Sequence, residues 1–175
     1  MFFIESEEEF ALCPNCGSVL EYHSRVIRGL TDKTGEKSTY SIRVLKCVNQ
    51  ACPTTYHREL PDIIIPYQRY DAESIEEAIS QSDADITVAA DQSTIYRWRR
   101  WFSSKATHII MALLSVTAVI EGNADSSSLV IKDQDKPIGA IKGIVGRETN
   151  WMSETVRILL NSSKWIFNRS AFLTG

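Results

Sequence analysis

Long hydrophobic runs are missing from this 175-residue sequence. The longest apolar stretch, IIMALLSVTAVI, covers residues 109–120, whereas a membrane-spanning helix needs about 20 apolar residues. We therefore expect a buried core helix here, and no membrane partner. The first ten residues, MFFIESEEEF, carry acids where a secretory signal has its basic region. The expected location is the cytoplasm.

Two neighbouring segments each lack charge of one sign, the first positive and the second negative. Residues 71–91 contain seven acids and no Lys or Arg, whereas residues 92–120 contain no acid. The second segment holds Arg97, Arg99, Arg100 and Lys105. The net charge of −3 therefore conceals a segregated distribution, which leaves a local basic surface available to an acidic partner.

Cysteine is scarce, and its four positions form two close pairs. Cys13-Pro-Asn-Cys16-Gly17 is typical of a metal knuckle, and Cys47 and Cys52 form a second pair with four residues between them. In an intracellular chain such spacing favours a metal over disulfides. Four thiolates suit one structural Zn²⁺ with no open coordination position, which excludes hydrolytic chemistry at the metal. The predicted ligands are Cys13, Cys16, Cys47 and Cys52.

Three other interpretations of the cysteines stay open. The four side chains could be buried without a metal. CPNC could be a redox motif, although such a motif needs a following helix to lower the thiol pKa, and here the next residues favour a strand. Finally, His57 in TYHREL could replace Cys52 as the fourth ligand.

The pattern along the chain predicts an α+β protein. Two segments rich in β-branched and aromatic residues, VLEYHSRVIRGL and STYSIRVLKC, flank the turn sequence TDKTGEKS. The resulting hairpin would bring the second cysteine pair beside the first. We expect a small β zinc ribbon over 1–60, a proline-bounded connector over 61–70, an all-α helix-turn-helix over 71–103, and C-terminal helices packing on it over 104–175.

The helix-turn-helix is expected from three short helical patterns. Asp71 is a candidate N-cap for a first helix with Ser74, Ile75, Ala78 and Ile79 on one face. A second short helix is expected at about 84–90, and Ser93 is a candidate cap for the third. A separate apolar helix would run from Ser104 to Ile120 and end at Gly122. A polar loop is expected near 123–137, and a last helix through Met152, Val156, Leu159 and Leu160 would break at about 161–163.

The segment STIYRWRRWF, residues 93–102, concentrates arginines and aromatic rings. At 100° per residue, Ile95, Trp98 and Phe102 share a buried face, with Tyr96, Arg97, Arg100 and Ser93 opposite. An arginine side chain can form two parallel hydrogen bonds to guanine or to phosphate, so this face predicts contact with double-stranded DNA. A surface helix whose arginines pair with the acids of 71–83 is the alternative.

Together these motifs resemble a known family. CPNCG, YHSRVIR, IRVLKC, HRELPD and PYQRY, followed by STIYRWRRWF, look like an uncharacterised bacterial family of short proteins with an N-terminal zinc ribbon and a transposase-type helix-turn-helix. By that resemblance Thr94, Tyr96, Arg97, Arg99 and Arg100 contact DNA, and Ser93 joins them from the helical pattern. In the family the second cysteine pair usually encloses two residues rather than four, which keeps His57 open as a ligand.

The function predicted from the sequence is DNA binding without catalysis, as a regulator or accessory factor of a mobile element. A DDE transposase core needs a sheet bearing three carboxylates, whereas residues 103–175 suggest helices with few acids. The alternatives are a zinc-ribbon adaptor that binds a protein, the DNA-binding part of a degenerate transposase, or a thiol redox enzyme. No heptad seam indicates a dimer, and a homo-oligomer stays open.

Overall fold

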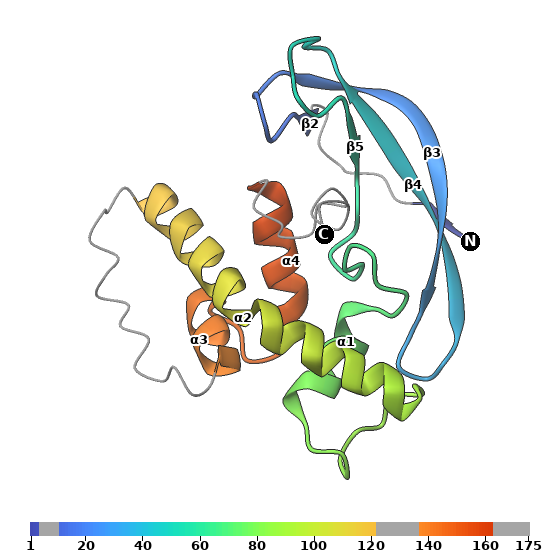
Figure 1. The fold of residues 1–175 in the computed structure, drawn as a ribbon. Helices are drawn as coiled ribbons and strands as arrows, with labels where there is room; N and C mark the ends of the chain where they lie inside the picture. The colour runs from blue at the N-terminus through green and yellow to red at the C-terminus, as the bar shows by residue number, and fades with distance from the viewer. Residues whose placement is uncertain (4–10, 122–136, 163–175) are drawn as a thin grey trace, which may run out of the picture.

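A computed structural model describes residues 1–3, 11–121 and 137–162 of the chain (Figure 1). The N-terminal half is a curled sheet and the C-terminal half is helical, which confirms the α+β class. The strands are β1 (Phe2–Phe3), β2 (Ala11–Leu12), β3 (Val19–Thr31), β4 (Lys37–Cys47) and β5 (Tyr56–Arg58). The helices are α1 (Ala72–Ser80), α2 (Gln92–Glu121), α3 (Pro137–Val145) and α4 (Trp151–Asn161).

The β3–β4 hairpin is the centre of the sheet, as the sequence predicts. β3 pairs with β4 in antiparallel register from Leu20 opposite Cys47 to Thr31 opposite Lys37. β2 pairs with β3, whereas β5 and the short parallel β1 both pair with β4. At the turn, the Asp32 carboxylate accepts the backbone N–H groups of Thr34 and Glu36, each at 2.9 Å. Gly35 supplies the positive φ of 89° that closes this turn.

The connector between sheet and helices is tied to both. Arg28 of β3 donates to the carbonyl oxygen of Gln68 at 2.7 Å, and the backbone N–H of Thr31 donates to that of Arg69 at 2.8 Å. The Tyr70 ring packs edge-on against Trp98 of α2, with centroids 4.9 Å apart. A small core of Leu30, Ile42 and Ile64 seals the junction. The sheet is thereby joined to the helical unit at its hairpin end.

The helices share one apolar core. Ile75 of α1, Trp98 and Phe102 of α2, Ile141 of α3 and Trp151 of α4 are all buried in it. The expected N-cap of α1 is confirmed, because the Asp71 carboxylate accepts the Ser74 N–H at 2.8 Å. The N-terminus of α4 is capped from a distance instead: the Glu76 carboxylate accepts the N–H groups of Asn150 at 3.0 Å and Met152 at 2.9 Å.

The expectation of a second helix at about 84–90 is wrong. Residues 81–91 form a turn, bends and irregular backbone, because residues elsewhere in the chain bind their polar groups. The Glu77 carboxylate accepts the N–H and hydroxyl of Thr87 at 2.6 and 2.8 Å, and the Ala89 N–H donates to the Lys33 carbonyl at 2.7 Å. The connection between α1 and α2 is therefore much longer than the 3–4-residue turn of a helix-turn-helix.

Two further expectations about the helices need correction, and one helix was not expected at all. Asp91 caps α2 in place of Ser93, since its carboxylate accepts the Thr94 N–H at 2.8 Å. The separate helices expected over 93–102 and 104–120 are one continuous helix, α2, which crosses the boundary drawn at 103/104. α3 was not expected. Gly122, most of the predicted polar loop and the stretch after Ser162 lie outside the described residues.

The C-terminal part of α2 is buried on one side only. Ile109, Ile110, Leu113 and Val116 lie in the core, whereas Met111, Val119 and Ile120 are exposed. By length and composition alone, the stretch Gln92–Ile120 would also suffice to cross a membrane, with a mean hydropathy of 1.4 in its most apolar window. Its inward stripe nevertheless belongs to the core that α1, α3 and α4 share.

Candidate metal centre and nucleic-acid interface

The first cysteine pair lies in a tight turn between β2 and β3. The Cys13 N–H donates to the Ser18 carbonyl at 2.7 Å, and the Gly17 N–H donates back to the Cys13 carbonyl at 2.8 Å. Gly17 has a φ of 70°, in the left-handed region where a side chain would be strained. The sequence CPNCG thus folds locally into a knuckle that points both sulfurs the same way.

The second pair lies between β4 and β5. Cys47 ends β4, and its N–H donates to the Thr55 carbonyl at 2.9 Å. The Cys52 N–H donates to the Asn49 carbonyl at 3.0 Å, while the Asn49 side chain accepts the Ala51 N–H at 3.0 Å. This Asx turn folds the four intervening residues so that the wider spacing still returns Cys52 to the site.

The four sulfurs form a compact cluster that could hold a metal ion. Cys13 Sγ lies 3.7 Å from Cys52 Sγ, Cys16 Sγ lies 3.5 Å from Cys47 Sγ, and all four lie within 4.8 Å of one another. Tetrahedral Zn²⁺ with Zn–S bonds of about 2.3 Å requires sulfurs about 3.8 Å apart. The cluster therefore fits a closed tetrathiolate site, and the prediction that the hairpin unites the two pairs is confirmed.

Backbone N–H groups are directed at three of the sulfurs. Those of Ser18, Asn49 and Thr54 donate to Cys16, Cys47 and Cys52, and each bond favours the thiolate. Hydrogen bonds from the Ser18 hydroxyl and N–H lower the pKa of the Cys16 thiol to about 6, whereas burial raises the pKa of the Cys47 thiol to about 12. The sequence analysis did not single out Ser18. Its position directly after CPNCG is the signal that could have identified this hydroxyl as a donor to the cysteines.

His57 borders the cluster without belonging to it. Its Nε2 lies 3.3 Å from Cys13 Sγ and 3.1 Å from the Thr54 carbonyl oxygen, whereas the four sulfurs alone form the mutually close group. An imidazole N–H in this position can donate to a metal-bound thiolate from outside the ligand set. The structure thus places Cys52, rather than His57, among the four clustered side chains.

The outward face of α2 carries four of the six residues predicted to contact DNA. Ser93, Tyr96, Arg97 and Arg100 are exposed, and Tyr96 is 65% exposed. On the opposite face Ile95, Trp98 and Phe102 are buried, which confirms the predicted orientation of this segment. The exposed side continues through Ser104, Thr107 and His108. We call Ser93, Tyr96, Arg97, Arg100, Ser104 and Thr107 the α2 face.

Thr94 and Arg99, the other two predicted DNA contacts, do not lie on the α2 face. Thr94 is only 8% exposed, and its hydroxyl donates to the Asp91 carboxylate at 2.9 Å. The Arg99 guanidinium donates to the carbonyl oxygens of Ala78 at 2.8 Å and Gln81 at 2.7 Å and pairs with Asp83. These two side chains join α2 to its cap and to α1, so the interpretation of arginines pairing with the acidic segment applies to Arg99.

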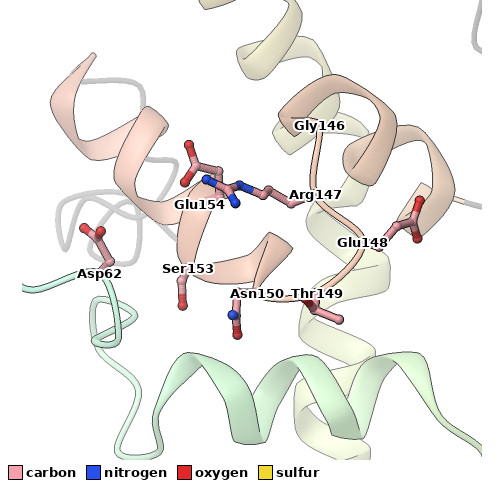
Figure 2. Close-up of a pocket in the computed structure, with 8 residues that line it drawn as sticks. All are labelled: Asp62, Gly146, Arg147, Glu148, Thr149, Asn150, Ser153 and Glu154. Atoms are coloured by element: carbon pink, nitrogen blue, oxygen red, sulfur yellow. The ribbon is translucent and has the colours of Figure 1, made fainter.

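A polar hollow of about 440 Å³ lies between the connector and the α3–α4 loop (Figure 2). Asp62, Arg147, Asn150, Ser153 and Glu154 are among the residues that line it. Glu154 is already paired with Arg157 of its own helix. Within the described part of the chain, no histidine or cysteine lines this hollow beside Ser153.

The comparison with known families follows this geometry. Residues 13–98 match a family model described as a domain of unknown function (DUF6431). The matched segment contains both cysteine pairs, the hairpin, α1 and the first turns of α2, so the cluster and the start of the α2 face belong to one similar unit. No curated protein and no solved structure matches the chain. The similarity reaches an uncharacterised domain, and it does not identify a transposase-type helix-turn-helix.

Proposed function

We propose that this protein binds duplex DNA through the α2 face, with one structural Zn²⁺ holding the cysteine end of the sheet as a zinc ribbon. The observation that carries the proposal is the composition of that face. Over residues 92–120 it contains arginines, hydroxyls and a phenol but no carboxylate. Arginine, Tyr and Ser side chains supply the usual contacts to phosphates and base edges.

The underside of the same segment supports this assignment. Trp98 and Phe102 are buried, and Arg99 clamps α2 onto α1, so the outward side chains project from a fixed helix. A rigid element positions base-reading groups better than a loop does. Arg97 Nη2 donates to the Thr94 hydroxyl oxygen at 2.7 Å, and Arg100 forms no hydrogen bond or ion pair with another described residue. Both guanidiniums keep donors for a nucleic acid.

The metal has a structural role in this proposal. Cys13, Cys16, Cys47 and Cys52 would hold Zn²⁺, which supplies a crosslink between the knuckle and the far end of β4. Sites of this kind contribute about 10–16 kcal/mol of apparent binding free energy, enough to order a small sheet. No catalysis is assigned. By its resemblance to transposase-type proteins, we propose that the chain acts as a regulator or accessory factor of a mobile element, in the cytoplasmic location expected from the sequence.

The proposal is tested by titrating zinc-loaded protein into labelled duplex DNA at several KCl concentrations. The variant R97A/R100A should lower the affinity and reduce the slope of log K against log salt by about 1.8, since each neutralised phosphate contributes about 0.9. The charge-matched control K37A/R147A, at two other exposed positions, should retain the wild-type slope. Absence of duplex binding in dilute salt would contradict the proposal and favour the protein-adaptor alternative.

A further inference from the structure

A second group of exposed basic and aromatic side chains lies on the sheet, near its cysteine end. The register pairs Lys46 of β4 with Tyr56 of β5, and Val44 with Arg58. Residues opposite one another in an antiparallel pair share a face, and side chains two apart on a strand share it too. Lys46, Tyr56 and Arg58 therefore lie on one face of the sheet, and all three are exposed.

A β-bulge adds His23 to this face. The register between β3 and β4 shifts between Tyr22 and Ser24, which leaves His23 as the extra residue. Its ring lies 4.9 Å from that of Tyr56, tilted by 45°. The contact supports the Tyr56 ring on one side, while Tyr56 is still 51% exposed. We call Lys46, Tyr56, Arg58 and His23 the sheet stripe.

Lys46 and Arg58 form no ion pair with another described residue, and one carboxylate, that of Glu21, shares the face of the stripe. Glu21 lies opposite Lys46 in the register. Arg58 instead adds to a basic neighbourhood: burial, and after it the charge of Arg58, lower the pKa of the Arg28 guanidinium. The exposed Lys46 and Arg58 thus favour an anionic partner.

The stripe and the α2 face lie toward opposite ends of the hairpin. The cysteine end carries the stripe, whereas the hairpin turn contacts the loop before α2 through Lys33 and Ala89 (Figure 1). From Lys46 back to its first residue, β4 extends about 30 Å at 3.3 Å per residue, and the side chain of Lys37, nine residues from Lys46, lies on the other face of the sheet. This length is close to one turn of duplex DNA, about 34–36 Å. A duplex of two turns is therefore longer than the hairpin that separates the two surfaces.

We propose that the sheet stripe is a second contact for the phosphodiester backbone of duplex DNA, with Lys46 and Arg58 on phosphates and the Tyr56 hydroxyl donating to a phosphate oxygen. The inference rests on the proposed function of the α2 face and adds a sequence-independent anchor to it. Contacts of this kind set register and affinity without reading bases. The metal cluster would act on DNA binding through this stripe, because β4 and β5 flank the second cysteine pair.

The test compares wild type, K46A/R58A and K37A/R147A, all zinc-loaded, on duplexes of about 10 and about 24 base pairs that share the preferred site. On the long duplex K46A/R58A should lose about 1.8 from the salt slope and keep the sequence preference. On the short duplex it should bind as wild type does. Y56F should bind the long duplex about tenfold more weakly, as expected for one lost hydrogen bond to a charged oxygen, with an unchanged slope.

Each outcome separates the two proposals. An unchanged slope for K46A/R58A on the long duplex, or an equal loss for K37A/R147A, would overturn the sheet stripe while binding through the α2 face stands. If the wild-type protein binds neither duplex, the proposal that the α2 face binds DNA is itself overturned. Equal zinc content and melting temperature among the variants exclude misfolding, since all four mutated cations are exposed.

Discussion

The Arg99 guanidinium lies 2.8 Å from the carbonyl oxygen of Ala78, at the C-terminal end of α1. It also donates to the Gln81 carbonyl and pairs with Asp83, so one side chain satisfies carbonyl groups that the end of a helix leaves open. An arginine that the family resemblance assigns to DNA therefore serves the packing of α2 on α1.

Arg99→Ala should destabilise the protein by about 1–3 kcal/mol, because two carbonyl oxygens lose a charged donor. Arg100→Ala, one residue along and exposed, should stay within about 0.5 kcal/mol of wild type. Urea unfolding followed by circular dichroism measures both. Equal effects of the two substitutions would contradict the assignment of Arg99 to the helix packing.

Removal of the metal should unfold the cysteine end of the sheet first. With four thiols unligated, Cys13 and Cys47 become buried polar groups without the ion that joins them, whereas the helical core contains no cysteine. Chelation should therefore abolish amide protection in β2 and β5 and preserve it in α1 and α4. Hydrogen exchange measures this, and unchanged protection of β5 after complete zinc loss would refute the structural role.

Cys52→Ser and His57→Gln should have different effects on the metal site. Loss of a thiolate ligand should change the Co²⁺ absorption spectrum of the substituted protein, since the ligand set changes. His57→Gln should keep the tetrathiolate spectrum and lower the metal affinity by about 10–100-fold, the usual effect of an outer hydrogen-bond partner. A spectrum altered by His57→Gln and unchanged by Cys52→Ser would show that His57 is the ligand.

Glu76 makes the stability of the helical unit depend on pH, and the direction of this dependence follows from the shift of its pKa. Burial raises the pKa of its carboxyl above the ordinary value of 4.5, against the opposing effect of the Met152 and Asn150 N–H groups. Because the unfolded chain releases this proton more readily, the contribution of Glu76 to stability should fall as the pH rises from about 4.5 through the folded pKa. Glu76→Gln should lack this slope. Denaturant midpoints of both proteins between pH 4 and 7 measure the difference, and parallel profiles would contradict it.

The parts of the site that sequence predicts are those fixed by neighbouring residues. CPNCG sets its own turn, and the hairpin needs only two β segments around TDKTGEKS, so the meeting of the cysteines follows from local patterns. The Asp71 cap and the buried face of Ile95, Trp98 and Phe102 are equally local.

The parts that sequence does not predict depend on distant partners. Residues 84–90 include three alanines, which favour a helix, but the Glu77 carboxylate and the Lys33 carbonyl accept hydrogen bonds from their backbone. Arg99 and Arg100 are indistinguishable by residue type, and only the position of α1 separates them. Asp91 and Ser93 are both good caps. α3 contains Gly139 and Gly143, which weaken any helical signal.

The most direct measurement for the central claim is selection of bound duplexes from a random pool by zinc-loaded protein. The account predicts enrichment of a short sequence motif by wild type and by K37A/R147A, and loss of that motif in R97A/R100A. Enrichment of the same motif by R97A/R100A, or no enrichment by wild type in dilute salt, would contradict it.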